Sequence, residues 1–306
     1  MLTEHVTFRP RGAFSLAQSI QFLSGFGPLA YRAHHDDPER TLRLAFAIER
    51  DWRPAAVSVR EGGDGGVSAT IAADGAAADL ARDQLERMLS LDIDASLLGQ
   101  ALRGDRVAAE LVDELRGLRP VCFASPYEAA CWAVLSQRVQ MKQAARIRVR
   151  MCERLGREID VDGQTLHTFP NPEALRATRS IEGVSDVKVE RLHGIAGAAL
   201  DGRLDAATLR SAGAAQAIED VQQIPGIGPF GADLVVIRGA GEPDHFSRIE
   251  RRLHAAMADA YDVDARDIDA LAAIAAPWKP FRSWIGFLLR TRWALRSSSS
   301  ARRDAG

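Results

Sequence analysis

A glycine-rich segment at residues 224–231 has the spacing that most directly suggests a chemistry. It reads IPGIGPFG and contains Gly226, Gly228 and Gly231. Glycine tolerates positive φ, so a tight turn here would let backbone N–H groups converge outward. The N-terminus of a following helix would add the positive end of its dipole, and together they would bind a phosphate without reading base sequence. We expect Ile227 to anchor the turn in the core.

The same glycines match G-x-G-x-x-G, the fingerprint of dinucleotide-binding folds. That fingerprint requires a strand before the first glycine and a helix after the last. Here the preceding residues have helical spacing, with Ala215, Ile218 and Val221 in phase. The pattern favours a helix-hairpin-helix. A nucleotide-binding oxidoreductase would require a strand before Gly226, and an ordinary turn between helices is the third reading.

Charge is unevenly distributed along the 306 residues, whose net charge is −2. Residues 1–118 carry 13 basic and 18 acidic groups, whereas 119–306 carry 26 and 23. Two stretches stand out: 138–157, with seven bases and one acid, and 278–303, with seven bases and no acid. Solvated helix faces explain most charge runs, but two in one region suggest a surface that faces a polyanion.

The elements that must position these groups fall into two sets. Short β-branched or alternating segments at 42–49, 54–60 and 67–72, between helical patterns at 15–23 and 76–89, predict a small α+β domain with an antiparallel sheet over residues 1–92. From about residue 92 the strand patterns stop, and Ala-rich amphipathic segments predict an all-α domain over 93–296. The low-complexity tail 297–306 is expected to be disordered.

Several classes of protein are excluded or disfavoured. No apolar stretch is long enough for a membrane span, and the N-terminus lacks a signal-peptide pattern, so we expect a cytoplasmic protein. Cys122, Cys131 and Cys152 show no metal-ligand spacing and are expected to be buried thiols. His254 follows Glu250 by four residues and His245 precedes it, but no third ligand is visible, so no metal site is expected.

In sequence order, several segments resemble the helix-hairpin-helix DNA glycosylase superfamily, and in particular its DNA-3-methyladenine glycosylase II branch. The segments are FSLAQSIQFLSGFG (14–27), SPYEAACWAVLSQRVQMKQAARI (125–147), VKVERLHGIAGAALDGRL (187–204), QIPGIGPFGADLVVIRG (223–239), PDHF (243–246) and WKPFRSW (278–284). The resemblance implies a sheet domain followed by two helical lobes that clamp damaged double-stranded DNA, usually as a monomer. It implies base-excision repair by release of alkylated purines.

The resemblance also implies what chemistry is absent. The four-cysteine iron–sulfur loop of some relatives is missing, and Phe230 stands where bifunctional relatives carry a Schiff-base lysine. We therefore expect a monofunctional hydrolase without lyase activity. No organic cofactor is expected, although relatives hold a structural monovalent cation at the hairpin.

By position, Glu250 replaces the essential aspartate of the family, with Asp244 as the alternative catalyst. A carboxylate there would stabilise oxocarbenium character on the sugar and orient the attacking water. Ser247 and Glu250 also spell a capping box, S-x-x-E, so Glu250 has a purely structural alternative. A non-catalytic or altered-specificity DNA-damage-binding paralogue is therefore the rival function.

The resemblance places further residues around a flipped-out base and its DNA. Phe22 and Phe230 fall on aromatic pocket positions, Arg290 falls on another that is usually aromatic, and Trp284 is a substitute aromatic. Gln137 and Arg138 align with the loop that fills the gap left by the flipped base. The residues expected to contact DNA are Gly226, Ile227, Gly228, Gln137, Arg138 and Lys142.

Overall fold

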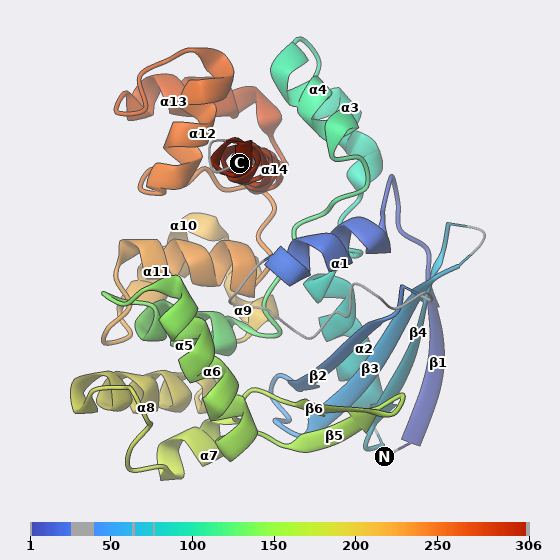
Figure 1. Cartoon of the computed structure of the whole chain (residues 1–306), viewed down its shortest axis with the longest axis vertical. Coiled ribbons are helices and arrows are strands. Elements are labelled where there is room, and N and C mark those ends of the chain that lie inside the picture. The colour runs from blue at the N-terminus through green and yellow to red at the C-terminus, as the bar shows by residue number, and fades with distance from the viewer. Residues whose placement is uncertain (1, 26–39, 63–64, 76, 304–306) are drawn as a thin grey trace.

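The computed structural model describes residues 2–25, 40–62, 65–75 and 77–303. Its N-terminal part contains an antiparallel sheet, as expected from the sequence, and the sheet has four strands in the order β1-β4-β3-β2 (Figure 1). The strands are β1 (Leu2–Phe8), β2 (Leu42–Ala47), β3 (Pro54–Glu61) and β4 (Val67–Ala73). Strand β1 was not foreseen, because its residues alternate weakly and all but Val6 and Phe8 are exposed.

Helices α1 (Leu16–Gly25) and α2 (Ala77–Met88) belong to the same part of the chain. The segment expected to resemble the family's N-terminal helix ends at Gly27, and its last two residues lie outside the described residues. Apolar side chains of α1 and α2 pack with the sheet, and the same hydrophobic cluster continues into the helical region.

The helical region contains the remaining elements. They are η2 (Ala95–Leu97), α3 (Leu98–Ala101), α4 (Arg106–Glu114), α5 (Pro126–Leu135), α6 (Met141–Leu155), α7 (Pro172–Ala177), α8 (Asp186–Leu200), α9 (Ala206–Ala212), α10 (Ala214–Gln222), α11 (Pro229–Leu234), η3 (Val235–Gly239), α12 (Arg251–Tyr261), α13 (Ile268–Ala275), η4 (Ala276–Trp278) and α14 (Arg282–Arg303). No helix among the described residues is long and apolar enough to span a membrane.

The expectation that strands stop near residue 92 is wrong. A hairpin of β5 (Glu158–Val161) and β6 (Gln164–His167) follows α6. Its Val161 and Leu166 pack against Ala45 and Ala56 of the large sheet, so tertiary contact stabilises strands too short to be recognised by pattern. At the other end of the chain, α14 continues to Arg303, through most of the tail expected to be disordered.

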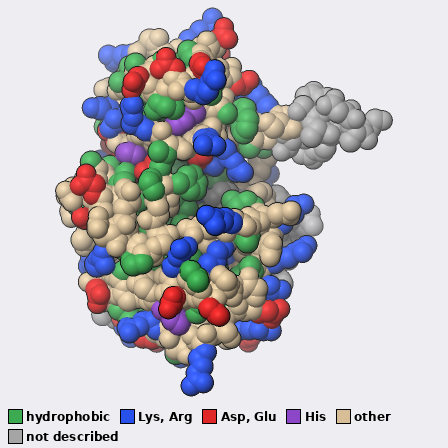
Figure 2. All heavy atoms as spheres, turned by 90° about the vertical axis from the view of Figure 1, so that its left-hand side faces the viewer, with side chains coloured by type: hydrophobic (Ala, Val, Ile, Leu, Met, Phe, Trp, Pro, Cys, Tyr) green, Lys and Arg blue, Asp and Glu red, His purple; other side chains and the backbone are tan. Residues whose placement is uncertain are grey.

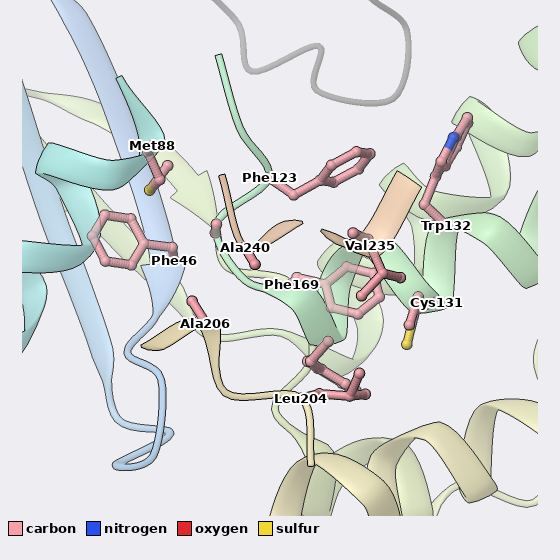
Figure 3. Packing of buried hydrophobic residues seen from close by; sticks show 14 of the residues in the cluster. Phe46, Met88, Phe123, Cys131, Trp132, Phe169, Leu204, Ala206, Val235 and Ala240 are labelled. Carbon is pink, nitrogen blue, oxygen red and sulfur yellow. The ribbon is translucent and has the colours of Figure 1, made fainter. Parts of the chain in front are cut away.

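Two hydrophobic clusters define the lobes of the molecule. The first joins the sheet and α2 to helices α5–α11 (Figure 3), where Phe46 and Met88 lie toward the sheet and Val235 and Trp132 lie among the helices. The second joins α3 and α4 to α12, α13 and α14. The chain therefore crosses between the lobes after α2, before α5 and after η3, and the segment 240–250, the bridging segment, forms the last of these crossings.

Gly239 permits the close approach of η3 to α5. A Cβ on Gly239 would lie 2.8 Å from Pro126 Cα. Residues 235–239 form a π-helical turn, in which Ala240 N–H donates to Val235 O at 2.8 Å, so α11 does not continue as a regular α-helix. This turn redirects the chain into the bridging segment.

Candidate active site and nucleic-acid interface

A pocket with a cavity volume of about 60 Å³ lies between the two lobes. One wall comes from α11 and η3, and the other from the bridging segment and from α12 and α14. Its lining residues are Phe230, Asp233, Leu234, Ile237, Arg238, His245, Ser247, Glu250, Leu253, Arg282, Ser283, Gly286, Phe287 and Arg290. The fold thus brings Glu250, Phe230 and Arg290, three of the expected site residues, into one cavity.

Glu250 occupies the N-terminus of α12. Its Oε1 accepts a hydrogen bond from Arg252 N–H at 3.1 Å, and its Oε2 pairs with Arg290 Nη1 at 2.7 Å. Burial lowers the pKa of Arg290, and the charge of Glu250 opposes that shift. The carboxylate lining the pocket is therefore held by one backbone donor and one guanidinium.

The capping box expected from S-x-x-E does not form. Glu250 itself is the N-cap, so the helix begins three residues later than Ser247 would require. Ser247 Oγ is buried and makes no hydrogen bond with the described residues. The pattern failed because His254, one turn into α12, binds the Ser247 carbonyl at 2.9 Å and holds that residue in the bridging segment.

Asp244, the alternative catalyst, does not line the pocket. Its Oδ1 accepts from Arg282 Nε at 2.7 Å and its Oδ2 from Arg282 Nη2 at 3.0 Å. Ser283 and His245 exchange hydrogen bonds beside this pair, at 2.9 and 3.0 Å. These contacts fasten the bridging segment to the start of α14, which is a structural task.

The aromatic residues divide between two cavities and the core. Phe230 is 52% exposed at the rim of the pocket. Phe22 lines the adjoining cavity, where its ring meets Phe287 edge-on at 4.8 Å between centroids. Trp284 lines neither cavity, because its turn of α14 faces the core and its ring packs on Phe281.

Arg238 is a buried cation that the sequence did not single out, and it borders both cavities. It donates to Val121 O and lies over the rings of Phe22 and Phe287, at 5.4 and 5.0 Å. Burial lowers its pKa to about 10. At neutral pH it remains charged and helps to hold the two lobes together.

The glycine-rich turn is a helix-hairpin-helix, with α10 before it and α11 after it. Gly226 has a φ of +93°, but Gly228 is extended, so only one glycine of the pair needs the left-handed region. Ile227 is 5% exposed and packs in the first cluster, as expected. The N–H of Gly228 makes no hydrogen bond with the described residues, so it is available to an external acceptor.

The loop between α5 and α6 lies against the hairpin. Gln137 Nε2 donates to Gly226 O at 2.8 Å, and its Oε1 accepts from Arg191 Nη1 at 3.1 Å. Lys188 Nζ donates to the carbonyls of Leu135 and Gln137. Gln137 therefore joins the two loops, and the next residue, Arg138, is exposed with a φ of +56°.

In the first basic stretch, ion pairs neutralise several cations, so fewer of them are free to bind a polyanion than the count of seven bases suggests. Arg148 is buried and paired with Glu128, while Arg150 and Arg154 pair with Glu182. Arg138, Lys142 and Arg146 are exposed. On the face shown in Figure 2, Lys and Arg side chains lie on both sides of a central group of hydrophobic side chains.

Known proteins share this arrangement in sequence and in fold. The chain is 31% identical over 201 residues to a probable bifunctional transcriptional activator/DNA repair enzyme AlkA of Mycobacterium tuberculosis, covering 65% of this chain and 40% of the relative. It is 25% identical to a DNA-3-methyladenine glycosylase of Bacillus subtilis, covering 67% of this chain and 69% of the relative. No family model matches the sequence.

Among solved structures, a 3-methyladenine DNA-glycosylase from Archaeoglobus fulgidus has the same fold, with a TM-score of 0.74 at 20% identity over 94% of this chain and 97% of that one. An 8-oxoguanine glycosylase/lyase from Clostridium acetobutylicum gives a TM-score of 0.67 at 16% identity over 95% and 97% of the two chains.

The chain is therefore similar in sequence to DNA-3-methyladenine glycosylases and in fold to DNA glycosylases of solved structure. Its relatives by sequence carry the names of the DNA-3-methyladenine glycosylase branch, which confirms the resemblance of the sequence segments to that branch. The chain spans about 40% of the length of the Mycobacterium relative. It contains the sheet and the hairpin, but the four-cysteine loop of some members is absent from its three-cysteine sequence.

Proposed function

We propose that this protein is a DNA glycosylase of base-excision repair that hydrolyses the N-glycosidic bond of alkylated purines. The observation that carries the proposal is the position of Glu250, whose carboxylate lines a pocket between the lobes. A base turned out of the duplex would enter this pocket. The names of the sequence relatives support the same activity.

In the proposed mechanism, Glu250 acts on the sugar while the pocket holds the base. As the N-glycosidic bond breaks, positive charge develops on the sugar, and the carboxylate stabilises it. A water on the same side of the sugar is oriented by the carboxylate and completes hydrolysis. An alkylated purine is already cationic, so it leaves with little acid assistance.

We propose that the enzyme lacks lyase activity. A lyase of this fold forms a Schiff base with a lysine amine, and no lysine is among the described residues that line the pocket. Borohydride reduction in the presence of abasic DNA should therefore trap no covalent complex. A trapped complex would mean that an amine reaches the sugar.

Double-stranded DNA is the proposed partner, contacted through the hairpin and the loop at Gln137 and Arg138. No step of the proposal uses a cofactor. The carbonyls of Ile224 and Gly226 already accept from Ile227 N–H and Gln137 Nε2, so a structural monovalent cation at the hairpin would have to share these oxygens.

The test is single-turnover release of bases from methylated duplex DNA by the wild type and by Glu250→Gln. Glutamine keeps an oxygen to cap Arg252 N–H but removes the charge, so release should fall by about 100-fold or more with DNA affinity nearly unchanged. Glu110→Gln, an exposed carboxylate on α4, is the matched control. Unchanged release by Glu250→Gln would remove Glu250 from the mechanism and favour the damage-binding alternative.

A further inference from the structure

Two polar atoms in the pocket have no hydrogen-bond partner among the described residues. They are Asp233 Oδ2 and Ser247 Oγ, and their residues are 7% and 3% exposed. Buried polar atoms are almost always bonded, because leaving one unpaired costs the full desolvation penalty. Both residues line the same cavity, from opposite walls. A ligand that supplies their partners would account for both.

Asp233 lies within an apolar surface of the pocket. Phe230, Leu234 and Ile237 follow the same helical face of α11 and η3, and Phe287 and Leu253 line the opposite wall. Such a slot fits a flat aromatic ring, with one polar edge meeting the carboxylate.

The other charges in this pocket are already engaged. Glu250 pairs with Arg290, Arg282 with Asp244, and Arg238 donates to Val121 O. His245 Nε2 lies 3.7 Å from Asp233 Oδ1, which is too long for a hydrogen bond. Asp233 Oδ2 is therefore the carboxylate oxygen lining the pocket that has no hydrogen-bond partner among the described residues.

We propose that Asp233 and Ser247 are specificity-determining residues that select alkylated adenine over alkylated guanine. Asp233 Oδ2 accepts a hydrogen bond from the exocyclic amino group of the flipped base, and Ser247 Oγ donates to the neighbouring ring nitrogen N7. This inference rests on the proposed glycosylase function.

The donor and acceptor pattern of the two purines explains the preference. This edge of adenine carries the N6 amino donor beside the N7 acceptor, whereas guanine carries O6 and N7, both acceptors. A carboxylate accepts only, so it pairs with the adenine amino group and repels guanine O6. In 7-methylguanine, N7 is also blocked. Both alkylated bases are cationic in DNA, so attraction to the charge of Asp233 is common to them.

The experiment measures single-turnover release of 3-methyladenine and of 7-methylguanine from the same methylated duplex. The wild type should release 3-methyladenine faster. Asp233→Asn adds an amide donor that O6 accepts, so the ratio of the two rates should fall about tenfold or more. Asp259→Asn, an exposed aspartate on α12, is the matched control and should leave the ratio unchanged.

A second variant keeps the test decisive if Asp233→Asn does not fold. Ser247→Ala removes the donor to N7, so it should slow release of 3-methyladenine severalfold without changing release of 7-methylguanine. Thermal unfolding of each variant reports whether it is folded.

Three outcomes would overturn the inference: no preference in the wild type, an equal fall in both rates for Asp233→Asn, or an equal fall in both rates for Ser247→Ala. Failure of the wild type to release any methylated base would instead overturn the proposed function, so the two failures are distinguishable.

Discussion

At the scale of single residues, Glu250 combines a capping contact with an ion pair. Its two oxygens are held by Arg252 N–H and by Arg290, so the carboxylate has little freedom to rotate. Arg290 lines the same pocket, and its pairing with Glu250 gives this arginine a defined partner there.

We predict that Arg290→Met lowers the free energy of unfolding by about 1–3 kcal/mol, because Glu250 then remains largely buried without its cation. Urea unfolding measures the change. Arg266→Met is the control, since the Arg266–Asp264 pair is exposed on the surface, where solvent screening leaves an ion pair little effect on stability. Equal losses in the two variants would contradict the role assigned to Arg290.

At the scale of elements, the hairpin has two glycines with different tasks. Gly226 needs its positive φ, and a Cβ on it would lie 2.6 Å from Arg191 Cδ. Gly228 is extended, and a Cβ on it would meet open space. The first glycine therefore serves the fold, and the second leaves room for a ligand at the N-terminus of α11.

We predict that Gly226→Ala destabilises the protein by about 1–2 kcal/mol, whereas Gly228→Ala changes its stability by less than about 1 kcal/mol. Both variants should bind duplex DNA more weakly. In Gly228→Ala, the added methyl obstructs the approach of a phosphate. Thermal unfolding and fluorescence anisotropy with duplex DNA separate the two effects. Wild-type affinity in Gly228→Ala would show that phosphate does not approach there.

Asp205 joins the sheet domain to α9. It caps the helix through Thr208 N–H at 2.8 Å and forms a two-point pair with Arg50, at 2.6 and 2.8 Å. Burial alone would raise the pKa of Asp205, but the hydrogen bonds from Arg50 and Thr208 outweigh burial and hold the pKa below its usual range.

A lowered pKa in the folded state means that Asp205 contributes stability above the pKa of the unfolded chain, near pH 4, and loses it as pH falls further. We predict that the free energy of unfolding of Asp205→Asn falls less than that of the wild type between about pH 5 and pH 3. Urea unfolding across this range is the measurement. Parallel pH profiles would contradict the prediction.

At the scale of the whole molecule, the net charge of −2 conceals an uneven surface. Within the first basic stretch, Arg148 forms a buried ion pair with Glu128, and Arg150 and Arg154 pair with Glu182. Of the other cations in this stretch, which are exposed, Arg138 lies on the loop beside the hairpin, Lys142 and Arg146 lie on α6, and Arg157 lies just before β5. The DNA interface we propose is therefore narrower than the sequence charge suggests.

We predict that DNA affinity falls as salt rises, and that Lys142→Ala combined with Arg146→Ala reduces the slope of log affinity against log salt. The slope should fall by about 0.9 for each phosphate that the variant no longer neutralises. Arg154→Ala, which removes a cation already paired with Glu182, should leave the slope unchanged. Titrations at several salt concentrations measure it, and a salt-independent affinity would contradict a phosphate-binding interface.

The sequence by itself determined the elements whose signals are local. The phase of Ala215, Ile218 and Val221 predicted α10, the glycines predicted the hairpin, and the order of similar segments indicated the superfamily. Periodicity and turn chemistry are properties of neighbouring residues, so they can be read without a structure.

Only the tertiary structure decided which groups share the pocket. Asp233 and Ser247 are 14 residues apart and carry no joint pattern, yet they line one cavity because the bridging segment folds back onto α11. Contacts between distant segments also pair Glu250 with Arg290. The same kind of contact explains why the capping box at Ser247 does not form. Burial, orphaned atoms and ion pairs arise from contacts between distant segments, which the local pattern of side chains does not encode.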